Sequence, residues 1–285
     1  MLDCIVVGGG PAGLSAAINL HQRGKSCLVL SAGAGYLAKA ERMDNYLGMP
    51  GMTGQEMLRQ FGEHAAGMDI EVRTGRVGNI LPFDGHFMVN FGGDMLESRS
   101  IILATGVSKA KPVAGEAERL GMGVSYCATC DGMLYRGRDV VVWGLAEEAA
   151  SEANFLAGIG CRVTFVAARR PAELEEAIPF EAGAIREVLG EGVVSAVRLA
   201  DGRELPCTGV FILRAAVAPD TLLPGLELED GFVRTGRDMS TSVPGVFAAG
   251  DLVGKPLQVA KAVGEGLVAA LSAAEYLDRA DREGK

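Results

Sequence analysis

The sequence has no apolar run of 18 residues and no basic segment followed by an export-signal core, so it contains no candidate membrane span or signal peptide. It also lacks a basic surplus, because 27 Lys and Arg stand against 36 Asp and Glu and leave a formal charge of -9. That balance makes nucleic acid and anionic membranes poor partners. We therefore expect a cytoplasmic protein, and 285 residues are enough for about two globular domains.

Histidines and cysteines are too few and too scattered for a zinc site. His21, His64 and His86 lie far in sequence from the single Cys-x-x-Cys pair, and zinc needs four ligands. The other cysteines show no spacing of a secreted disulfide framework, and Cys4 and Cys27 fall in predicted buried strands as small core residues. We therefore expect no metal and a reducing compartment.

The remaining pair, Cys127 and Cys130, is followed at once by Asp131. This spacing lets both thiols share one helical turn, where a disulfide can form and break with little backbone movement. A thiol near the donor-rich start of a helix usually has a depressed pKa. The pattern therefore predicts a redox-active, catalytic dithiol.

The pattern of apolar runs predicts two nucleotide-binding-like halves, the second inserted into the first. Each half opens with strand, helix and strand: residues 4–7, 14–20 and 27–30, and then strand 139–143, a small-residue helix and strand 162–166. The other expected elements are a helix over 55–66, an antiparallel meander with turns at Asp84-Gly85 and Gly92-Gly93 that ends in strand 100–104, a hairpin at Asp201-Gly202, a strand over 209–213 and a closing helix to about Tyr276.

The first strand leads into Gly8-x-Gly10-x-x-Gly13, with Pro11 and Ala12 between the last two glycines. Gly8 would make a tight turn, and Gly10 would let backbone N–H groups approach a pyrophosphate. Gly13 would let the helix pack closely on the strand. The motif therefore predicts a dinucleotide cradle.

Further motifs follow in the order Asn45-Tyr46, ATG at 104–106, GVSYCATCD at 123–131, FAAGD at 247–251 and GEG at 264–266. Over nearly the whole chain this order resembles the low-molecular-weight flavoprotein thioredoxin reductases. The resemblance implies an α/β fold of two Rossmann-like domains, each a three-layer ββα arrangement. Residues 1–113 and 215–285 would form the FAD-binding domain, and residues 114–214 would form the CxxC-bearing domain.

The resemblance also implies an FAD-containing homodimer that passes electrons from FAD through the Cys127–Cys130 pair to thioredoxin. By position, Cys130 would face the flavin, Cys127 would attack thioredoxin, and Asp131 would donate a proton. The implied FAD-binding residues are Gly8, Gly10, Pro11, Ala12, Gly13, Ser31, Asn45, Thr105, Gly106, Gly250, Asp251, Gln258 and Val259. Two positions of the implied flavin site depart from the family: Ser31 replaces the acidic residue for the adenosine ribose, and Leu257 replaces an Arg.

The second glycine fingerprint, which would bind NADPH, is eroded. After strand 139–143 the chain keeps Gly144, but Ala146 puts a methyl group where backbone should touch a pyrophosphate. Glu147 and Glu148 add negative charge at the start of the following helix. These features disfavour a dinucleotide.

The 2′-phosphate site is also incomplete, because Ala167 and Ala168 replace two of three expected basic residues. A shift of one residue could still aim Arg169 and Arg170 at a phosphate, so NADPH stays an alternative donor. An intact disulfide and flavin site beside an eroded nicotinamide site is similar to the ferredoxin-dependent branch of the family. We therefore expect reduced ferredoxin as the donor.

Ferredoxins are acidic, as this chain is, so docking would need a local basic patch. The candidate residues are Lys39, Arg42, Lys109, Lys111, Arg136 and Arg138, for which scattered solubilising charge is an equal alternative. Two further functions stay open: a dithiol oxidase that uses O2, and a non-catalytic FAD-bound redox sensor. The intact Cys127, Cys130 and Asp131 argue against the sensor.

Overall fold

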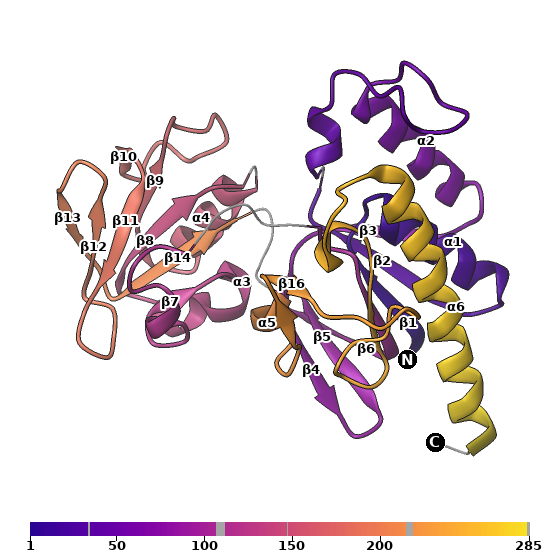
Figure 1. Ribbon diagram of the computed structural model, residues 1–285. Helices are drawn as coiled ribbons and strands as arrows, with labels where there is room; N and C mark the ends of the chain where they lie inside the picture. The colour runs from indigo at the N-terminus through magenta and orange to yellow at the C-terminus, as the bar shows by residue number, and fades with distance from the viewer. Residues whose placement is uncertain (34, 107–111, 147, 215–218, 284–285) are drawn as a thin grey trace. The chain divides into compact units, whose positions relative to one another are not determined.

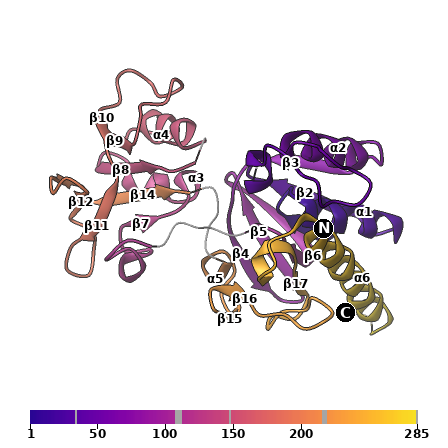
Figure 2. The ribbon, with the colours of Figure 1, turned by 45° about the horizontal axis from the view of Figure 1, so that its top comes forward.

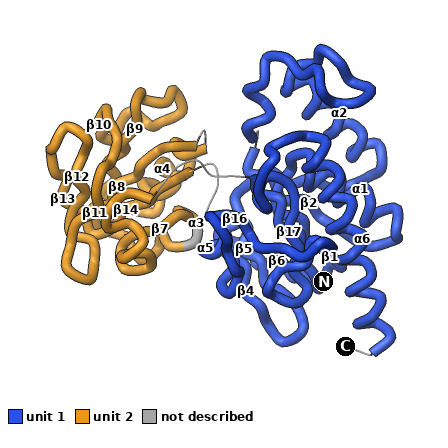
Figure 3. Tube along the Cα trace, in the orientation of Figure 1, with its two compact units in different colours: residues 1–107, 218–285 blue, residues 108–217 orange. Residues whose placement is uncertain are grey.

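The chain forms two compact units, Met1–Val107 with Ala218–Lys285 and Ser108–Val217 (Figure 3). The computed structural model describes residues 1–33, 35–106, 112–146, 148–214 and 219–283, together with the backbone but not the side chain of Cys130. Each unit is described separately. None of the helices within these ranges has an apolar stretch that could span a membrane.

Unit 1 (residues 1–107 and 218–285) is built on a seven-stranded sheet (Figure 1). Its elements are β1 (Leu2–Val7), α1 (Pro11–Gln22), β2 (Cys27–Ser31), η1 (Tyr36–Lys39), α2 (Gly54–Ala66), β3 (Glu71–Thr74), β4 (Val77–Phe83), β5 (His86–Phe91), β6 (Asp94–Leu103), α5 (Pro219–Leu222), β15 (Leu228–Glu229), β16 (Phe232–Val233), β17 (Val246–Ala248), η4 (Gly250–Val253) and α6 (Val259–Glu283).

In this sheet β3, β2, β1, β6 and β17 pair in parallel, and β6 continues into the antiparallel meander β4–β5–β6. Phe83 pairs with His86 and Phe91 with Asp94, so both hairpins turn over two residues. Those turns are the predicted Asp84-Gly85 and Gly92-Gly93.

Side chains that alternate along the parallel strands fill two cores, one on each face of the sheet. Val6 and Ile102 point to the face covered by α1 and α6, which lie side by side (Figure 2). Ile5 and Ile101 point to the other face, where β4, β5 and the segment around Leu222 cover them. The result is the expected three-layer order of helix, sheet and sheet.

Unit 2 (residues 108–217) repeats this order around a five-stranded parallel sheet, β10-β9-β8-β14-β7. One face is covered by α3 and α4 and the other by the antiparallel sheet β11-β12-β13. Its elements are η2 (Ala117–Arg119), β7 (Val124–Ser125), α3 (Ala128–Asp131), η3 (Gly132–Tyr135), β8 (Asp139–Gly144), α4 (Ala149–Gly158), β9 (Arg162–Ala167), β10 (Phe180–Ala182), β11 (Ile185–Leu189), β12 (Ala196–Leu199), β13 (Glu204–Pro206) and β14 (Gly209–Leu213).

The closing helix is longer than predicted, because α6 continues past Tyr276 to Glu283. Its last turns carry charged residues, which weakened the apolar signal that sets a helix boundary in sequence. Lys25 pairs with Asp278 at 2.5 Å, and Arg99 pairs with Asp281. These ion pairs hold the end of α6 against the rest of unit 1.

Candidate active site

Unit 2 carries the predicted dithiol at the start of α3. Cys127 directly precedes this helix, is 6% exposed and is disulfide-bonded, whereas Cys4, Cys27, Cys161 and Cys207 are free thiols. Cys130 lies in the same helical turn, and its side chain falls outside what the structure describes. The Cys127 sulfur lies 3.4 Å from the Thr129 hydroxyl.

A hydrogen-bonded ring connects Cys127 to Asp131 through Ser125, the last residue of β7. The Ser125 hydroxyl lies 2.7 Å from Asp131 Oδ2 and 3.2 Å from the Cys127 carbonyl oxygen, and it accepts a hydrogen bond from the Cys127 N–H at 3.1 Å. Ser125 is 3% exposed. The predicted acid is therefore held by a buried hydroxyl that sequence reasoning did not identify.

The start of α3 is less rich in free donors than its position in sequence predicts. The Ala128 N–H donates to Glu152 Oε2 of α4 at 3.1 Å, so a carboxylate already occupies this end of the helix. The helix is also only four residues long, which limits its dipole. Glu152 was not a sequence candidate, because its contact joins residues that are 24 positions apart.

Unit 1 contains the predicted pyrophosphate cradle at the start of α1. A Cβ atom on Gly8 would lie 2.1 Å from the Ala104 carbonyl oxygen, and one on Gly13 would lie 1.8 Å from the Gly8 carbonyl oxygen. Gly10 is the N-cap residue and has open space around it, with Pro11 next and no acidic residue in the first turn. The free N–H groups of this turn suit an anionic group.

The side chains around this cradle complete a site that fits FAD. Ser31 ends β2 beside the cradle, since a Cβ atom on Gly9 would lie 2.6 Å from its hydroxyl oxygen. The Thr105 hydroxyl, just after β6, is buried and has no hydrogen-bond partner within the described protein. Gly106 follows with φ +73°. A buried hydroxyl without a partner is the group that a bound cofactor would satisfy.

The motif at 247–251 is held against the cradle by α6. The Gly250 N–H donates to Glu265 Oε2 at 2.9 Å, and Lys261 Nζ donates to the carbonyls of Gly250 at 2.8 Å and Gly254 at 2.6 Å. A Cβ atom on Gly250 would lie 2.8 Å from the Cβ of Ala12. Burial raises the pKa of the Asp251 carboxyl in this loop.

A long-range contact joins the remaining predicted cofactor residues. Asn45 Nδ2 donates to Gln258 Oε1 at 2.7 Å across 213 residues, and Val259 begins α6 directly afterwards. The structure thus brings the predicted FAD residues to one end of unit 1 and the dithiol residues together in unit 2. Lys261 is an additional residue of this region that the motifs did not identify, and Glu265 is the central residue of the GEG motif at 264–266.

The second glycine fingerprint serves internal packing. A Cβ atom on Gly144 would lie 2.3 Å from the Phe165 ring, so this glycine makes room for a core side chain. The N-cap of α4 is the exposed Glu148, preceded by Ala146, and Glu147 lies outside the described residues. A negative charge therefore stands where a pyrophosphate would bind.

The two arginines after β9 are exposed, but Arg170 is already engaged. Its guanidinium donates to the carbonyls of Ile178 at 3.2 Å and Glu175 at 2.7 Å, and it lies over the Phe180 ring. This arrangement orders the loop after β9. Arg169 is exposed.

The basic residues considered for ferredoxin docking have different surroundings. Lys39 lies over the Tyr36 ring and Arg42 pairs with Asp44, both in unit 1. Arg136 and Arg138 are exposed in unit 2, on the loop between η3 and β8. Lys109 and Lys111 lie outside the described residues.

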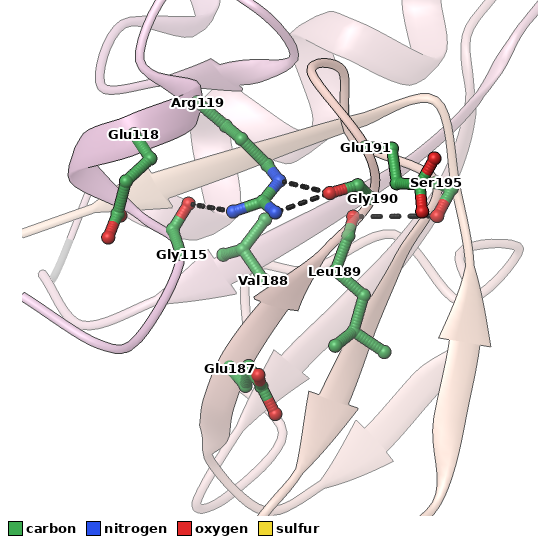
Figure 4. A pocket seen from close by; sticks show the side chains of 9 residues that line it. All are labelled: Gly115, Glu118, Arg119, Glu187, Val188, Leu189, Gly190, Glu191 and Ser195. Carbon is green, nitrogen blue, oxygen red and sulfur yellow. Dashed lines mark hydrogen bonds between the residues drawn. The ribbon is translucent and has the colours of Figure 1, made fainter.

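A separate hollow of about 560 Å³ lies on unit 2 (Figure 4). The Arg119 guanidinium crosses it and donates to the carbonyls of Gly190 and Gly115, each at 3.0 Å. Three glutamates also line it: Glu118, Glu187 and Glu191. Among the residues described, none of the predicted site residues lines this hollow.

Comparison with known proteins identifies the family of the chain. The model of the pyridine nucleotide-disulphide oxidoreductase family matches residues 2–266. Thioredoxin reductase of Treponema pallidum (strain Nichols) is 36% identical over 298 residues, which cover 97% of each chain. Thioredoxin reductase of Bacillus subtilis (strain 168) is 32% identical over 299 residues, covering 97% of this chain and 95% of that protein. Among solved structures, a ferredoxin-flavin thioredoxin reductase from Clostridium acetobutylicum matches with TM-score 0.91 and 37% identity over 99% of both chains.

Proposed function

We propose that reduced ferredoxin is the electron donor of this chain, which belongs to the low-molecular-weight thioredoxin reductases of the pyridine nucleotide-disulphide oxidoreductase family. As a member of that family, it is an FAD-dependent enzyme that reduces disulfides. The proposed acceptor is the disulfide of thioredoxin. Electrons would pass from FAD in unit 1 to the Cys127–Cys130 pair in unit 2 and then to thioredoxin.

The observation that carries the donor proposal is the N-terminus of α4. A dinucleotide needs a glycine for close backbone approach and free N–H groups for its pyrophosphate. Here Ala146 and the exposed Glu148 precede the helix. The methyl group and the carboxylate both oppose an anionic ligand.

Two further observations support a protein donor. The Arg170 guanidinium donates to two backbone carbonyls, so binding of a 2′-phosphate to Arg170 would have to break those hydrogen bonds. Each missing charge-assisted contact costs on the order of 1.5–3 kcal/mol, and about 1.4 kcal/mol is tenfold in affinity. The similarity to a ferredoxin-flavin thioredoxin reductase from Clostridium acetobutylicum points the same way.

The donor is tested by anaerobic reduction of the purified yellow protein, followed at the flavin band in a stopped-flow instrument. We expect reduced ferredoxin to bleach the flavin and to sustain thioredoxin turnover. NADPH and NADH at physiological concentrations should reduce it slowly or not at all. Full reduction by micromolar NADPH within a second would identify an NADPH-dependent thioredoxin reductase and would overturn the ferredoxin proposal.

The disulfide exchange follows from the two cysteines. FAD, when bound in unit 1, supplies the electron-transfer chemistry. The Cys127 thiolate would attack one thioredoxin sulfur, forming a mixed disulfide while the thioredoxin S–S bond breaks, and Asp131 would protonate the leaving thiolate. The Cys130 thiolate would then attack the Cys127 sulfur, which re-forms the enzyme disulfide and releases reduced thioredoxin. The enzyme dithiol is oxidised by two electrons and thioredoxin is reduced by two.

This order of attack predicts which variant traps its substrate. Cys127→Ser and Cys130→Ser should each abolish thioredoxin reduction, because exchange needs both sulfurs. Cys130→Ser should accumulate a mixed disulfide with thioredoxin on non-reducing gels, and Cys127→Ser should leave the flavin spectrum perturbed by Cys130. The opposite trapping pattern would reverse the two roles.

We also propose that the enzyme acts as a homodimer, as the resemblance implies. Light scattering coupled to size-exclusion chromatography measures the mass directly. A monomer mass near 29.7 kDa at working concentrations would refute this part of the proposal.

A further inference from the structure

Ser125 occupies the centre of the hydrogen-bonded ring in unit 2. Its hydroxyl oxygen is within hydrogen-bond distance of three groups: Asp131 Oδ2 at 2.7 Å, the Cys127 N–H at 3.1 Å and the Cys127 carbonyl oxygen at 3.2 Å. The residue ends β7, where Phe211 of β14 is its register partner, and it is almost fully buried. Its position is therefore fixed by the sheet rather than by the short helix α3.

A hydroxyl has one proton to donate and two lone pairs with which to accept. While Asp131 is a carboxylate, the Ser125 proton can point to Oδ2, at the shortest of the three distances. Once Asp131 is protonated, its own O–H can donate to the Ser125 oxygen. The Ser125 proton is then free to turn to the Cys127 carbonyl. The Cys127 N–H stays bonded in both arrangements, so each protonation state of Asp131 finds a partner without movement of the backbone.

We propose that Ser125 is a positioning residue that holds the Asp131 carboxyl beside the dithiol in both of its protonation states. The inference rests on the proposed function, because it assigns Asp131 as the acid of disulfide exchange. Ser125 itself does not contact the reacting disulfide of thioredoxin in this assignment. Its effect on the reaction passes through Asp131 and through the backbone of Cys127.

Other titratable groups lie on η3 and on elements that contact α3 or η3. On α4, Glu152 binds the Ala128 N–H at the start of the same helix. On η3, burial and next the charge of Asp131 raise the pKa of Tyr135. The Cys161 thiol lies 3.6 Å from the Gly132 carbonyl, and its pKa is raised by burial. None of these described contacts is made by the Ser125 hydroxyl, so its removal leaves them in place.

The test is the rate of a single disulfide exchange. The FAD-loaded enzyme is reduced anaerobically with dithionite and mixed with oxidised thioredoxin at constant pH. Ser125→Ala should lower the maximal rate about tenfold, because the acid is no longer held in place.

Three variants make the result specific. Ser125→Thr keeps a hydroxyl and should restore the exchange rate, and Ser195→Ala, which removes an exposed hydroxyl bonded to a backbone carbonyl, should change nothing. In an Asp131→Asn background, Ser125→Ala should slow exchange by less than about twofold, because coupled residues are not additive. If Ser125→Ala does not fold, Asp131→Glu displaces the carboxyl from the hydroxyl and must lower the exchange rate in the same way.

The outcomes separate this inference from the proposed function. Dithionite replaces the natural donor, so the result does not depend on ferredoxin. If the reduced native enzyme fails to reduce thioredoxin, the proposed acceptor is wrong. If the native enzyme reacts but Ser125→Ala leaves the exchange rate unchanged, or slows Asp131→Asn as much as it slows the native enzyme, Ser125 does not act through Asp131 and the proposal is wrong.

Discussion

Replacing Arg214 with Met is expected to be among the most damaging single changes in unit 2. Arg214 follows β14, and its guanidinium donates to both carboxylate oxygens of Glu116, which is 0% exposed. Glu116 also accepts from the Val113 N–H at 2.9 Å and from the Tyr126 hydroxyl at 2.8 Å. The guanidinium lies over the Tyr126 and Trp143 rings at 5.9 and 5.7 Å. The pair is thus enclosed by other side chains.

The magnitude follows from the carboxylate that would be left behind. Removing one partner of a buried ion pair typically costs about 3–5 kcal/mol, because the other charge stays buried and uncompensated. Arg214→Met should therefore lower the free energy of unfolding of unit 2 by about that amount at pH 7. Replacing both charges, in Glu116→Gln with Arg214→Met, should recover part of the loss, because no buried charge then remains.

The loss should depend on pH in a defined direction. Burial alone would raise the pKa of Glu116, but hydrogen bonds from Arg214, the Val113 N–H and Tyr126 hold it below its usual value. In the native protein this stabilisation is present above about pH 4.3 and is lost as pH falls through the lowered pKa. Without Arg214 the same pKa should rise above its usual value. The stability difference between the two proteins should therefore be larger at pH 8 than at pH 5.

The chain provides its own reporter, because Trp143 is its single tryptophan and lies beside Arg214. Urea unfolding followed by Trp143 fluorescence should show a midpoint lower by more than about 1 M, given the usual urea dependence for a domain of this size. Arg162→Met is the matched control, because Arg162 makes a two-pronged pair with Asp139 that is exposed, and its midpoint should hardly move. Equal midpoints for Arg162→Met and Arg214→Met, or a larger loss at pH 5 than at pH 8, would refute the reasoning.

Two further predictions concern the cradle and the free thiols. Gly13→Ala should yield protein without FAD, because the added Cβ would lie 1.8 Å from the Gly8 carbonyl oxygen. Gly264→Ala on α6 is the control, because a Cβ there meets open space and FAD should bind normally. The ratio of flavin to protein absorbance and chromatography of the released cofactor check both variants. Burial raises the pKa of the Cys4 and Cys207 thiols to about 12 and that of the Cys27 thiol to about 11. In the native protein at pH 8 these thiols should therefore resist iodoacetamide and react only after unfolding. Labelling of any of them in folded protein, detected by mass spectrometry, would contradict this.

The local elements of unit 1 were predictable because each has a signal within a few residues. The apolar run before Gly8 became β1, and the Gly8–Gly13 spacing marked the turn into α1. The Asp84-Gly85 turn located the first hairpin of the meander. In unit 2 the spacing of Cys127 and Cys130 likewise identified the turn that became α3. In all these cases the residues that determine the conformation are also the residues that adopt it.

The supporting contacts were not predictable, because they join residues that are distant in sequence. Glu116 and Arg214 are 98 residues apart, and in the sequence neither can be distinguished from an ordinary charged surface residue. Glu152 meets Ala128 only because α4 packs against α3. Ser125 lies within the motif, yet its role depends on where β7 ends relative to Asp131. Such contacts are consequences of packing, which a single sequence does not display.

The carboxyl edge of the parallel sheet in unit 2 is occupied by side chains of the chain itself. In doubly wound sheets, ligands bind where the parallel strands end. At that edge of unit 2, β7 ends at Ser125 beside the disulfide-bonded Cys127, β8 ends at Trp143 and Gly144, and Arg214 follows β14. Ser125 donates to Asp131, Arg214 donates to Glu116, and Gly144 leaves room for the Phe165 ring. The edge thus supports the dithiol and the core of unit 2 through residues of the chain itself.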